Sequence, residues 1–317
     1  MTTIRRVAVF GGSGFIGRYI VQRLARRGCR VVVIGRHASQ AGYLQPMGGV
    51  GQIVPVDLDI DNEQMVRAAV TGCEAVINLL GILAESGRQR FERLHVEAAG
   101  RIARQAREAG VERVVHLSAL GADTQSKSAY ARSKAEGEAA VRTAFPQATI
   151  LRPSVVFGPE DKFFNRFAAM AASTPFLPLI GGGQTRFQPV YVGDVADAVL
   201  ASLDQESARG AIYDLGGPRI YSFEKLMDLT LAETNRRRRL LRISFDVATF
   251  VSAFLQHLPG APLTPDQVEL LHHDNVVPVG AKTLRDLGIE PTAAELILPT
   301  YLNVYRRGGW FTTRRMA

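Results

Sequence analysis

Short apolar runs alternate with longer segments of helical pattern along the first half of the chain. Parallel strands are buried on both faces and therefore lack the polar alternation of half-exposed strands. Since most gaps between the runs have helical periodicity, the pattern predicts an α/β fold with a doubly wound parallel sheet. The expected strands are Val7–Phe10, Val31–Ile34, Ile53–Val56, Ala75–Leu80, Arg113–Leu117 and Thr149–Leu151.

The second half of the chain has a different pattern. Pro, Phe and Gly become frequent after about Pro153, and residues after about Ser222 are expected to be mainly helical and peripheral. A further helix at Val192–Leu203 and a strand at Ala211–Leu215 are expected to return to the core. We therefore expect a first domain over residues 1–155. Residues 156–317 would supply the remaining sheet elements and a smaller, mainly helical C-terminal cap or docking region.

A glycine-rich turn separates the first expected strand from a helix at Gly14–Arg27. In such a turn Gly11 can adopt a positive φ, Gly14 lets phosphates approach the main chain, and Gly17 lets the helix pack closely. The helix N-terminus then faces a pyrophosphate. The turn predicts a Rossmann-type dinucleotide-binding domain whose contacts are Gly11, Gly12, Ser13, Gly14, Phe15, Ile16 and Gly17.

The end of the second expected strand bears on the kind of dinucleotide. An acidic residue that holds the adenosine ribose usually stands there, whereas this chain has Arg36 and His37. An arginine can pair with a 2′-phosphate and stack on adenine, so we expect NADP(H). The alternative is a solvated arginine in an arginine-rich chain. Asp57 and Leu58, after the third strand, could bracket the adenine ring.

Composition limits the possible classes of protein. The chain has 317 residues, of which 46% are hydrophobic, and no apolar run reaches the roughly 18 residues of a spanning helix. We expect no signal or transit peptide ahead of the first strand. The net charge is +8, and only five of the 38 basic residues are lysines. Basic surfaces favour anionic partners, but the sequence contains no recognisable nucleic-acid module, so we expect no nucleic-acid binding.

Cysteines and histidines suggest no further chemistry. Cys29 and Cys73 give no disulfide framework and are expected to be core thiols in a reducing, cytoplasmic compartment. His272 and His273 are adjacent and so point to different sides, and no third ligand is suitably spaced; we expect no metal site. His116 lies in an apolar run and is expected to be a core histidine.

Six segments together resemble the extended or atypical type of the short-chain dehydrogenase/reductase superfamily. This resemblance implies that Tyr130 is the acid/base, that Lys134 lowers its pKa and holds the nicotinamide ribose, and that Ser118 orients the substrate oxygen. It also adds Leu80, Gly81, Pro153 and Val156 to the expected cofactor contacts. The segments are Gly11-x-x-Gly14-x-x-Gly17, Asp57-Leu58, Asn78-Leu-Leu-Gly81, Ser118, Tyr130-Ala-Arg-Ser-Lys134, and Arg152-Pro153 through Phe157-Gly158.

Position and activity are separate questions for these residues. Tyr130 and Lys134 lie four residues apart and so share one face of a helix. An isolated pair of this kind is often a surface tyrosine and lysine. Their place after a strand that ends at Ser118 favours a location at the nicotinamide site, but turnover stays open.

Motifs of the second half extend the resemblance over nearly the whole chain. Segments Pro153–Asn165, Gln188–Ala198 and Leu284–Pro291 are similar to the NADPH-binding accessory subunits of respiratory complex I, the NADH:ubiquinone oxidoreductase, and their bacterial relatives. The resemblance implies a tightly held, structural NADPH and contact near the junction of the peripheral and membrane arms. The alternatives are a soluble NADPH-dependent reductase or a nucleotide-sugar epimerase or dehydratase that acts on a small-molecule substrate through Tyr130, and an NADP(H)-sensing regulator.

One segment near the C-terminus suits a location at the inner face of a membrane. A helical stripe is preceded by Arg236–Arg239 and Arg242, so the helix could lie in a lipid interface or dock onto complex I subunits. The interpretation we favour from sequence is a core helix preceded by a solvated arginine turn. The stripe comprises Val247, Phe250, Val251, Phe254, Leu255 and Leu258.

Overall fold

The computed structural model describes residues 4–256 and 263–308. The chain forms two compact units, neither of which is continuous in sequence. The first comprises Met1–Pro153, Gly193–Leu215 and Pro278–Glu290, and the second comprises Ser154–Val192, Gly216–Val277 and Pro291–Ala317. The sequence predicted a first domain over residues 1–155, with residues 156–317 supplying the remaining sheet elements and a C-terminal cap or docking region. Within the second range, the segment 193–215 belongs to the first unit and supplies its last helix and strand, and the segment 278–290, which holds a 3-10 turn, belongs to the same unit.

The first unit contains a seven-stranded sheet of order β11-β6-β5-β4-β1-β2-β3, in which every pair is parallel. The predicted doubly wound parallel sheet is confirmed, although the fourth strand ends at Asn78 instead of Leu80. The strands are β1 (Arg6–Phe10), β2 (Arg30–Gly35), β3 (Ile53–Asp57), β4 (Ala75–Asn78), β5 (Arg113–Leu117), β6 (Thr149–Pro153) and β11 (Ile212–Leu215).

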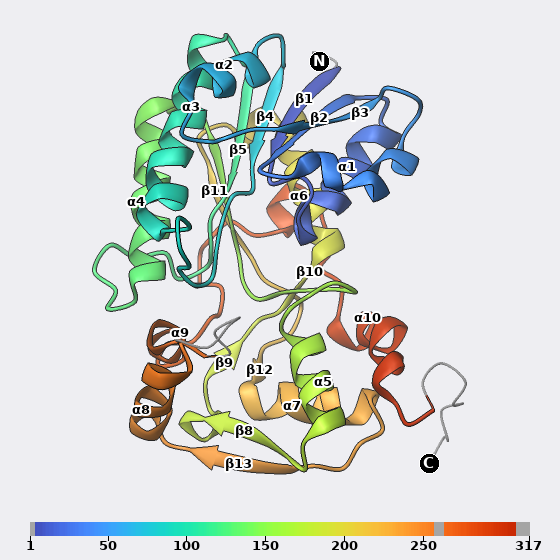
Figure 1. Ribbon diagram of the computed structural model, residues 1–317, viewed down its shortest axis with the longest axis vertical. Helices are drawn as coiled ribbons and strands as arrows, with labels where there is room; N and C mark the ends of the chain where they lie inside the picture. Colours follow the sequence, from blue (N-terminus) through green and yellow to red (C-terminus); the bar gives the residue numbers. More distant parts are fainter. Residues whose placement is uncertain (1–3, 257–262, 309–317) are drawn as a thin grey trace. The chain divides into compact units, whose positions relative to one another are not determined.

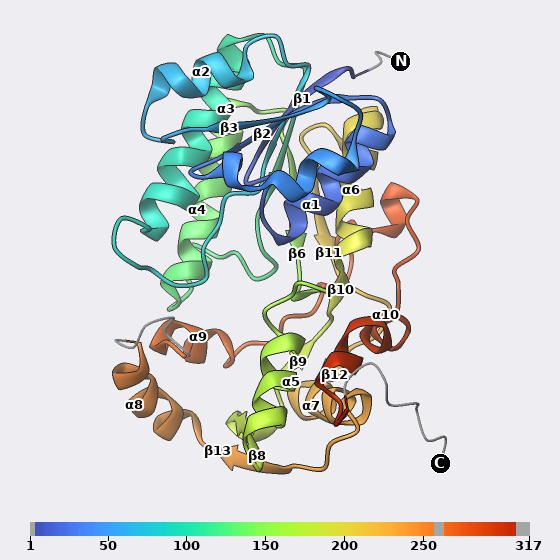
Figure 2. The same cartoon turned by 45° about the vertical axis from the view of Figure 1, so that its right-hand side comes forward.

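Helices cover both faces of this sheet (Figures 1 and 2). On one face lie α2 (Glu63–Val70), α3 (Ala98–Glu108) and α4 (Ala129–Ala144), and a π-helical segment at Glu92–Glu97 leads into α3. On the other face lie α1 (Phe15–Arg26) and α6 (Val192–Asp204). Short 3-10 turns occur at Ala38–Gln40, Gly42–Met47, Glu206–Ala208 and Arg285–Leu287.

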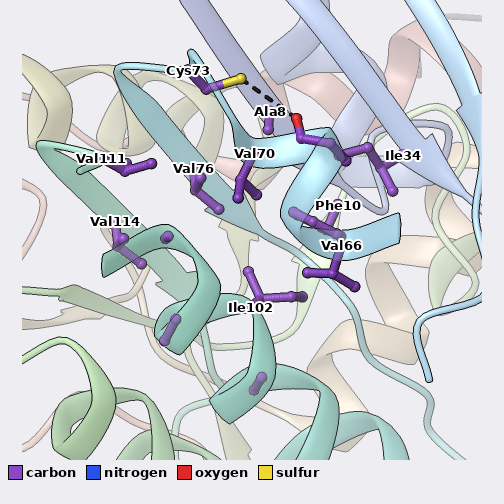
Figure 3. Close-up of a cluster of buried hydrophobic side chains, with 14 of the residues drawn as sticks. Ala8, Phe10, Ile34, Val66, Val70, Cys73, Val76, Ile102, Val111 and Val114 are labelled. Carbon is purple, nitrogen blue, oxygen red and sulfur yellow. Dashed lines mark hydrogen bonds between the residues drawn. The ribbon is translucent and has the colours of Figure 1, made fainter. Parts of the chain in front are cut away.

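The core of the first unit lies between the sheet and its helices. Figure 3 shows Ala8, Phe10 and Ile34 of the strands beside Val66 of α2 and Ile102 of α3. All of these side chains are buried, as expected of strands with both faces covered. Both cysteines are buried and free, as predicted, and the thiol of Cys73 donates to the carbonyl of Ala69.

The second unit combines helices with pairs of short strands. Its core is rich in aromatic rings, and Phe163 contacts the rings of Phe164, Phe167, Phe187 and Phe223. The strands are β7 (Val156–Phe157), β8 (Phe176–Ile180), β9 (Arg186–Phe187), β10 (Val190–Tyr191), β12 (Tyr221–Ser222) and β13 (Arg239–Ile243). The helices are α5 (Phe164–Ser173), α7 (Phe223–Glu233), α8 (Phe245–Leu255), α9 (Pro265–Leu270) and α10 (Ala294–Tyr301), with 3-10 turns at Gly181–Gly183 and Leu302–Tyr305.

The region after Ser222 is mainly helical, as predicted, but Arg239–Ile243 is a strand. It pairs in parallel with β8, and Arg239 lies opposite Phe176. Leu240 packs against the core of the second unit, whereas Leu241 is exposed. The sequence does not reveal this strand, because Leu240 and Leu241 are adjacent apolar residues flanked by arginines, so no alternation of apolar and polar residues is seen.

Candidate dinucleotide site

Most of the predicted site residues lie at one edge of the first unit. Because carboxyl ends of parallel strands meet at the same edge of a sheet, residues that follow different strands come together there. The exception is Val156, which belongs to the second unit. The segment Gly11–Gly17 follows β1, Arg36 and His37 follow β2, Asp57 ends β3 and Leu58 follows it, Leu80 and Gly81 follow β4, Ser118 follows β5, and Pro153 ends β6.

The glycine turn has the predicted geometry. Gly11 has a φ of +77°, and its amide donates to the carbonyl of Ile34 at 2.8 Å. A Cβ on Gly17 would lie 2.5 Å from the carbonyl oxygen of Gly11, so only glycine allows α1 to pack this close to the turn. Gly14 caps α1 without a side-chain hydrogen bond, and the first turn of α1 holds no acidic residue. The amides at this helix end therefore suit an anion.

Two residues that the sequence did not single out lie over this turn. The hydroxyl of Tyr43 donates to the carbonyl of Ser13 at 2.5 Å, and the guanidinium of Arg18 lies 4.7 Å from the centre of the Tyr43 ring. Tyr43 reaches the turn from the 3-10 segment Gly42–Met47. No local motif indicates this contact, because it depends on the path of the loop after β2.

The carboxylate nearest to the end of β2 is already bound. Asp57 pairs in register with Gly35, and its carboxylate accepts hydrogen bonds from the amide of Ser39 at 2.8 Å and from its hydroxyl. These hydrogen bonds lower the pKa of Asp57. Arg36 is exposed and forms no ion pair with any described residue. At the end of β2, the exposed guanidinium of Arg36 therefore has no described carboxylate as a partner, and the nearby carboxylate of Asp57 is hydrogen-bonded to Ser39.

Lys134 is the buried cation of the site. Its side chain is 4% exposed, and its ammonium donates to the carbonyl of Leu117, the last residue of β5, at 2.9 Å. Burial lowers the pKa of Lys134 to about 8, and the negative charge of Glu138 partly opposes this effect. The hydroxyl of the neighbouring Ser118 is buried and has no hydrogen-bond partner among the described residues.

Glu138 is itself neutralised from β6. Arg152 donates to its two carboxylate oxygens at 2.8 Å and 2.6 Å, a bidentate pair. Asp214 of β11 lies 4.0 Å from the same guanidinium. The positive charge of Arg152 thus faces the carboxylates of both Glu138 and Asp214.

Tyr130 stands at the start of α4, where Ser128 caps the helix by accepting from the amide of Ala131. Tyr130 is only partly exposed. Its ring centroid lies 5.9 Å from that of Phe91 and 5.6 Å from that of His95, both in T-shaped arrangements. Tyr130 and Lys134 both lie on α4, so their spacing of four residues places them on one face of the helix, as predicted.

His95 was missed by sequence reasoning. The amide of Ile82 donates to its Nε2 at 3.0 Å, which leaves the proton on Nδ1 for the hydroxyl of Ser133 at 2.8 Å. Ser133 in turn donates to the carbonyl of Tyr130. Burial and the charge of Lys134 lower the pKa of His95 to about 3, so the ring is neutral. The π-helical segment that contains His95 leaves no signature in the sequence.

His116 is a buried histidine on β5, as predicted. The amide oxygen of Asn78 accepts from the amide of Leu80, so the amide nitrogen of Asn78 donates to His116 Nδ1 at 3.1 Å. Burial and the charge of Lys134 hold its pKa well below the usual range. The Nε2–H of His116 has no partner among the described residues.

The residues present fit a nicotinamide dinucleotide. The uncapped end of α1 and the close turn at Gly17 suit a pyrophosphate, and the unpartnered hydroxyl of Ser118 would gain a hydrogen bond from a bound ribose or substrate oxygen. A bound dinucleotide would supply or accept a hydride, while Lys134 would hold its ribose. The protein itself contributes binding, orientation and burial.

Comparisons with known proteins identify the family of the chain. The model of the NAD dependent epimerase/dehydratase family matches residues 7–216. The chain is 36% identical over 313 residues to mitochondrial NADH dehydrogenase (ubiquinone) 1 alpha subcomplex subunit 9 of Arabidopsis thaliana, with 95% of this chain and 78% of that protein covered. The subunit of the same name from Mus musculus is also 36% identical, with 96% and 81% covered.

Among solved structures, triphenylmethane reductase of Citrobacter sp. has the same fold, with a TM-score of 0.75 at 17% identity over 94% of this chain and 99% of that one. At such an identity the likeness concerns the fold alone. Family membership supports the binding of a nicotinamide dinucleotide. The chain belongs to the NAD dependent epimerase/dehydratase family, in the group that includes the alpha subcomplex subunit 9 proteins of respiratory NADH dehydrogenase.

Proposed function

We propose that this protein holds NADP(H) in a structural role as an accessory subunit of a complex I-type NADH dehydrogenase. The observation that carries the proposal is the similarity of almost the entire chain to alpha subcomplex subunit 9 proteins, 36% identity over 95% of its length. That similarity continues into the part of the second unit that lies beyond residue 216, where the match to the family model ends. Relatives that share the complete chain therefore favour a subunit over a soluble reductase or epimerase.

The choice of NADP(H) rests on the end of β2. Arg36 offers an exposed guanidinium without an acidic partner among the described residues, which is the group that binds a 2′-phosphate. The carboxylate of the neighbouring Asp57 already accepts two hydrogen bonds from Ser39. It is therefore less available to accept hydrogen bonds from ribose hydroxyls, as an NAD-binding carboxylate does. Arg36 and His37 would contact the phosphate, and Leu58 would border the adenine.

The structural role is tested by asking whether the nucleotide turns over. The purified chain is analysed for its bound nucleotide, which we expect to be NADP(H), and is then mixed with candidate carbonyl substrates and, separately, with nucleotide sugars. We expect no oxidation of the bound NADPH beyond that of the Tyr130→Phe variant. Turnover that disappears in Tyr130→Phe would overturn the structural role and establish Tyr130 as an acid/base.

Assembly needs its own measurement. Membranes of the source organism are solubilised mildly, and the complex that contains this chain is isolated. We expect it to copurify with NADH dehydrogenase subunits. A chain that retains NADPH but never associates with such a complex would contradict the subunit assignment while leaving the cofactor assignment intact.

A further inference from the structure

The apolar stripe of α8 faces outward, not into the core. Val247, Phe250, Val251 and Phe254 are 53%, 67%, 42% and 62% exposed. The interpretation of this helix as a core element is therefore wrong for these four residues, while Leu255 is half-buried and Leu258 lies outside the described residues. Phe250 and Phe254 pack edge to face at 5.2 Å and form one apolar ridge.

The inner face of α8 explains this orientation. Ala248 and Ser252 are its buried residues, and Ala248 packs with Ile180 at the end of β8 and Ile243 at the end of β13. The same cluster contains Val268 of α9, so the small side chains of α8 face the cluster and the bulky residues lie outside it. Ser244 caps the helix and joins it directly to β13. Val247, Phe250, Val251 and Phe254 thus remain exposed in the described part of the chain.

A second apolar patch lies on the preceding strand pair. Phe176 of β8 and Leu241 of β13 are 46% and 42% exposed. Together with Pro175 and Arg237–Arg239 they line a surface hollow of about 600 Å³. Exposed apolar surface of this kind is unusual on a protein that faces only water.

The same segment concentrates positive charge. Arg237 and Arg239 form no ion pair among the described residues, and Arg236 and Arg238 donate their Nε–H groups to the carbonyls of Tyr305 and Ala171. Arg242 is the only one of these five arginines with a carboxylate within 4.0 Å in the described chain, Glu224 at 3.7 Å. Burial and the charges of Arg238 and Arg307 lower the pKa of Arg236. The cations are therefore left largely uncompensated.

We propose that α8 and the outer face of β8 and β13 form a docking surface for an anionic phospholipid bilayer, and we call it the lipid-facing surface. Phosphates in the headgroup layer would pair with Arg237 and Arg239, while Phe250 and Phe254 would enter the boundary with the acyl chains. A bilayer offers both anionic headgroups for the arginines and apolar acyl chains for the phenylalanines. The described residues contain no helix long and apolar enough to cross a membrane, so the helix would lie along the surface.

The test uses the purified full-length chain and vesicles of phosphatidylcholine with and without phosphatidylglycerol. We expect sedimentation with the anionic vesicles, weakened by salt, and little with the neutral ones. Phe250→Ser/Phe254→Ser should weaken binding roughly 100-fold or more, because two exposed rings lose their burial in lipid. Arg237→Gln/Arg239→Gln should weaken it about 25-fold, since each basic residue contributes about fivefold.

Matched controls remove similar groups elsewhere. Leu296 is an exposed apolar residue of α10, and Leu296→Ser should bind like the wild type. Arg88→Gln/Arg285→Gln removes the same charge from the first unit and should cost far less than the Arg237/Arg239 pair. Bound NADP(H) and the melting temperature should be unchanged in all four variants, which separates this proposal from the cofactor assignment. Equal binding to both vesicle types, no binding at all, or equal losses in variants and controls would overturn the proposal, and binding only to isolated respiratory subunits would do so as well.

Discussion

The ammonium of Lys134 lies 2.9 Å from the carbonyl oxygen of Leu117, and this hydrogen bond joins α4 to the end of β5. Since Ser118 is the next residue, the bond fixes the buried cation beside the unpartnered hydroxyl. Burial lowers the pKa of Lys134 to about 8, although the negative charge of Glu138 opposes this effect. The site thus contains a lysine that titrates close to physiological pH.

This pKa has a consequence for stability. Between about pH 8 and the unfolded value of about 10.4, the unfolded chain binds a proton that the folded chain does not, so stability due to Lys134 rises with pH in this window. Lys134→Met should therefore be more stable than the wild type at pH 7, by on the order of 2 kcal/mol, and the gain should shrink toward zero near pH 10. Urea unfolding at both pH values measures it. Exposed Lys225→Met is the control, and an offset that does not change with pH would contradict the prediction.

His95 should make the stability of the protein depend on pH below about pH 6.5. Its pKa of about 3 lies below the unfolded value, so its contribution to stability is complete above pH 6.5 and is lost as the pH falls toward 3. Between pH 7 and pH 5 this group alone should cost about 2 kcal/mol. In His95→Gln, which keeps an acceptor and a donor, the loss of free energy of unfolding over this interval should be smaller by that amount. An identical pH dependence in both proteins would mean that His95 is protonated in the folded state.

Gly17 should tolerate no side chain. Gly17→Ala places a Cβ within 2.6 Å of the Gly12 backbone, which must shift and distort the phosphate turn. We expect a loss of about 1–3 kcal/mol in stability and a large loss of NADPH affinity, measured by thermal unfolding and by NADPH fluorescence. Gly42→Ala is the control, because its Cβ would have no neighbour within 4 Å. Equal behaviour of the two variants would contradict the close packing at Gly17.

Arg152 should matter more than either carboxylate that it neutralises. Arg152→Leu leaves the buried carboxylates of Glu138 and Asp214 without the guanidinium that both of them face, so we expect a loss of about 3–5 kcal/mol at pH 7. Glu138→Gln removes one charge of the group, and Arg152 still faces Asp214, so its cost should be about 2 kcal/mol. Denaturant titration gives both values. If Arg152→Leu proved no worse than Glu138→Gln, the pairing of Arg152 with two carboxylates would be wrong.

Features set by local pattern could be predicted, whereas features set by loop paths could not. Strands such as β1 and β2 are apolar because both faces are covered, and the glycines of the turn are required by its backbone. His95 and Tyr43 reach the site through a π-helical segment and a 3-10 turn, which have no sequence signature. The stripe of α8 was visible, but a periodic pattern does not show what covers an apolar face. In α8 the buried face is formed by the small residues Ala248 and Ser252, which lie between the large ones in the sequence.

The interrupted order of the first unit affects how the protein is synthesised. β6 becomes an inner strand only when β11 pairs with it, and β11 begins at Ile212, after the ribosome has made Ser154–Val192 of the other unit. Before that point a nascent chain exposes β6 as an open sheet edge, which invites pairing with other chains. A truncation after Pro153 would make this edge permanent, so the isolated first segment should aggregate although it contains most of the dinucleotide site.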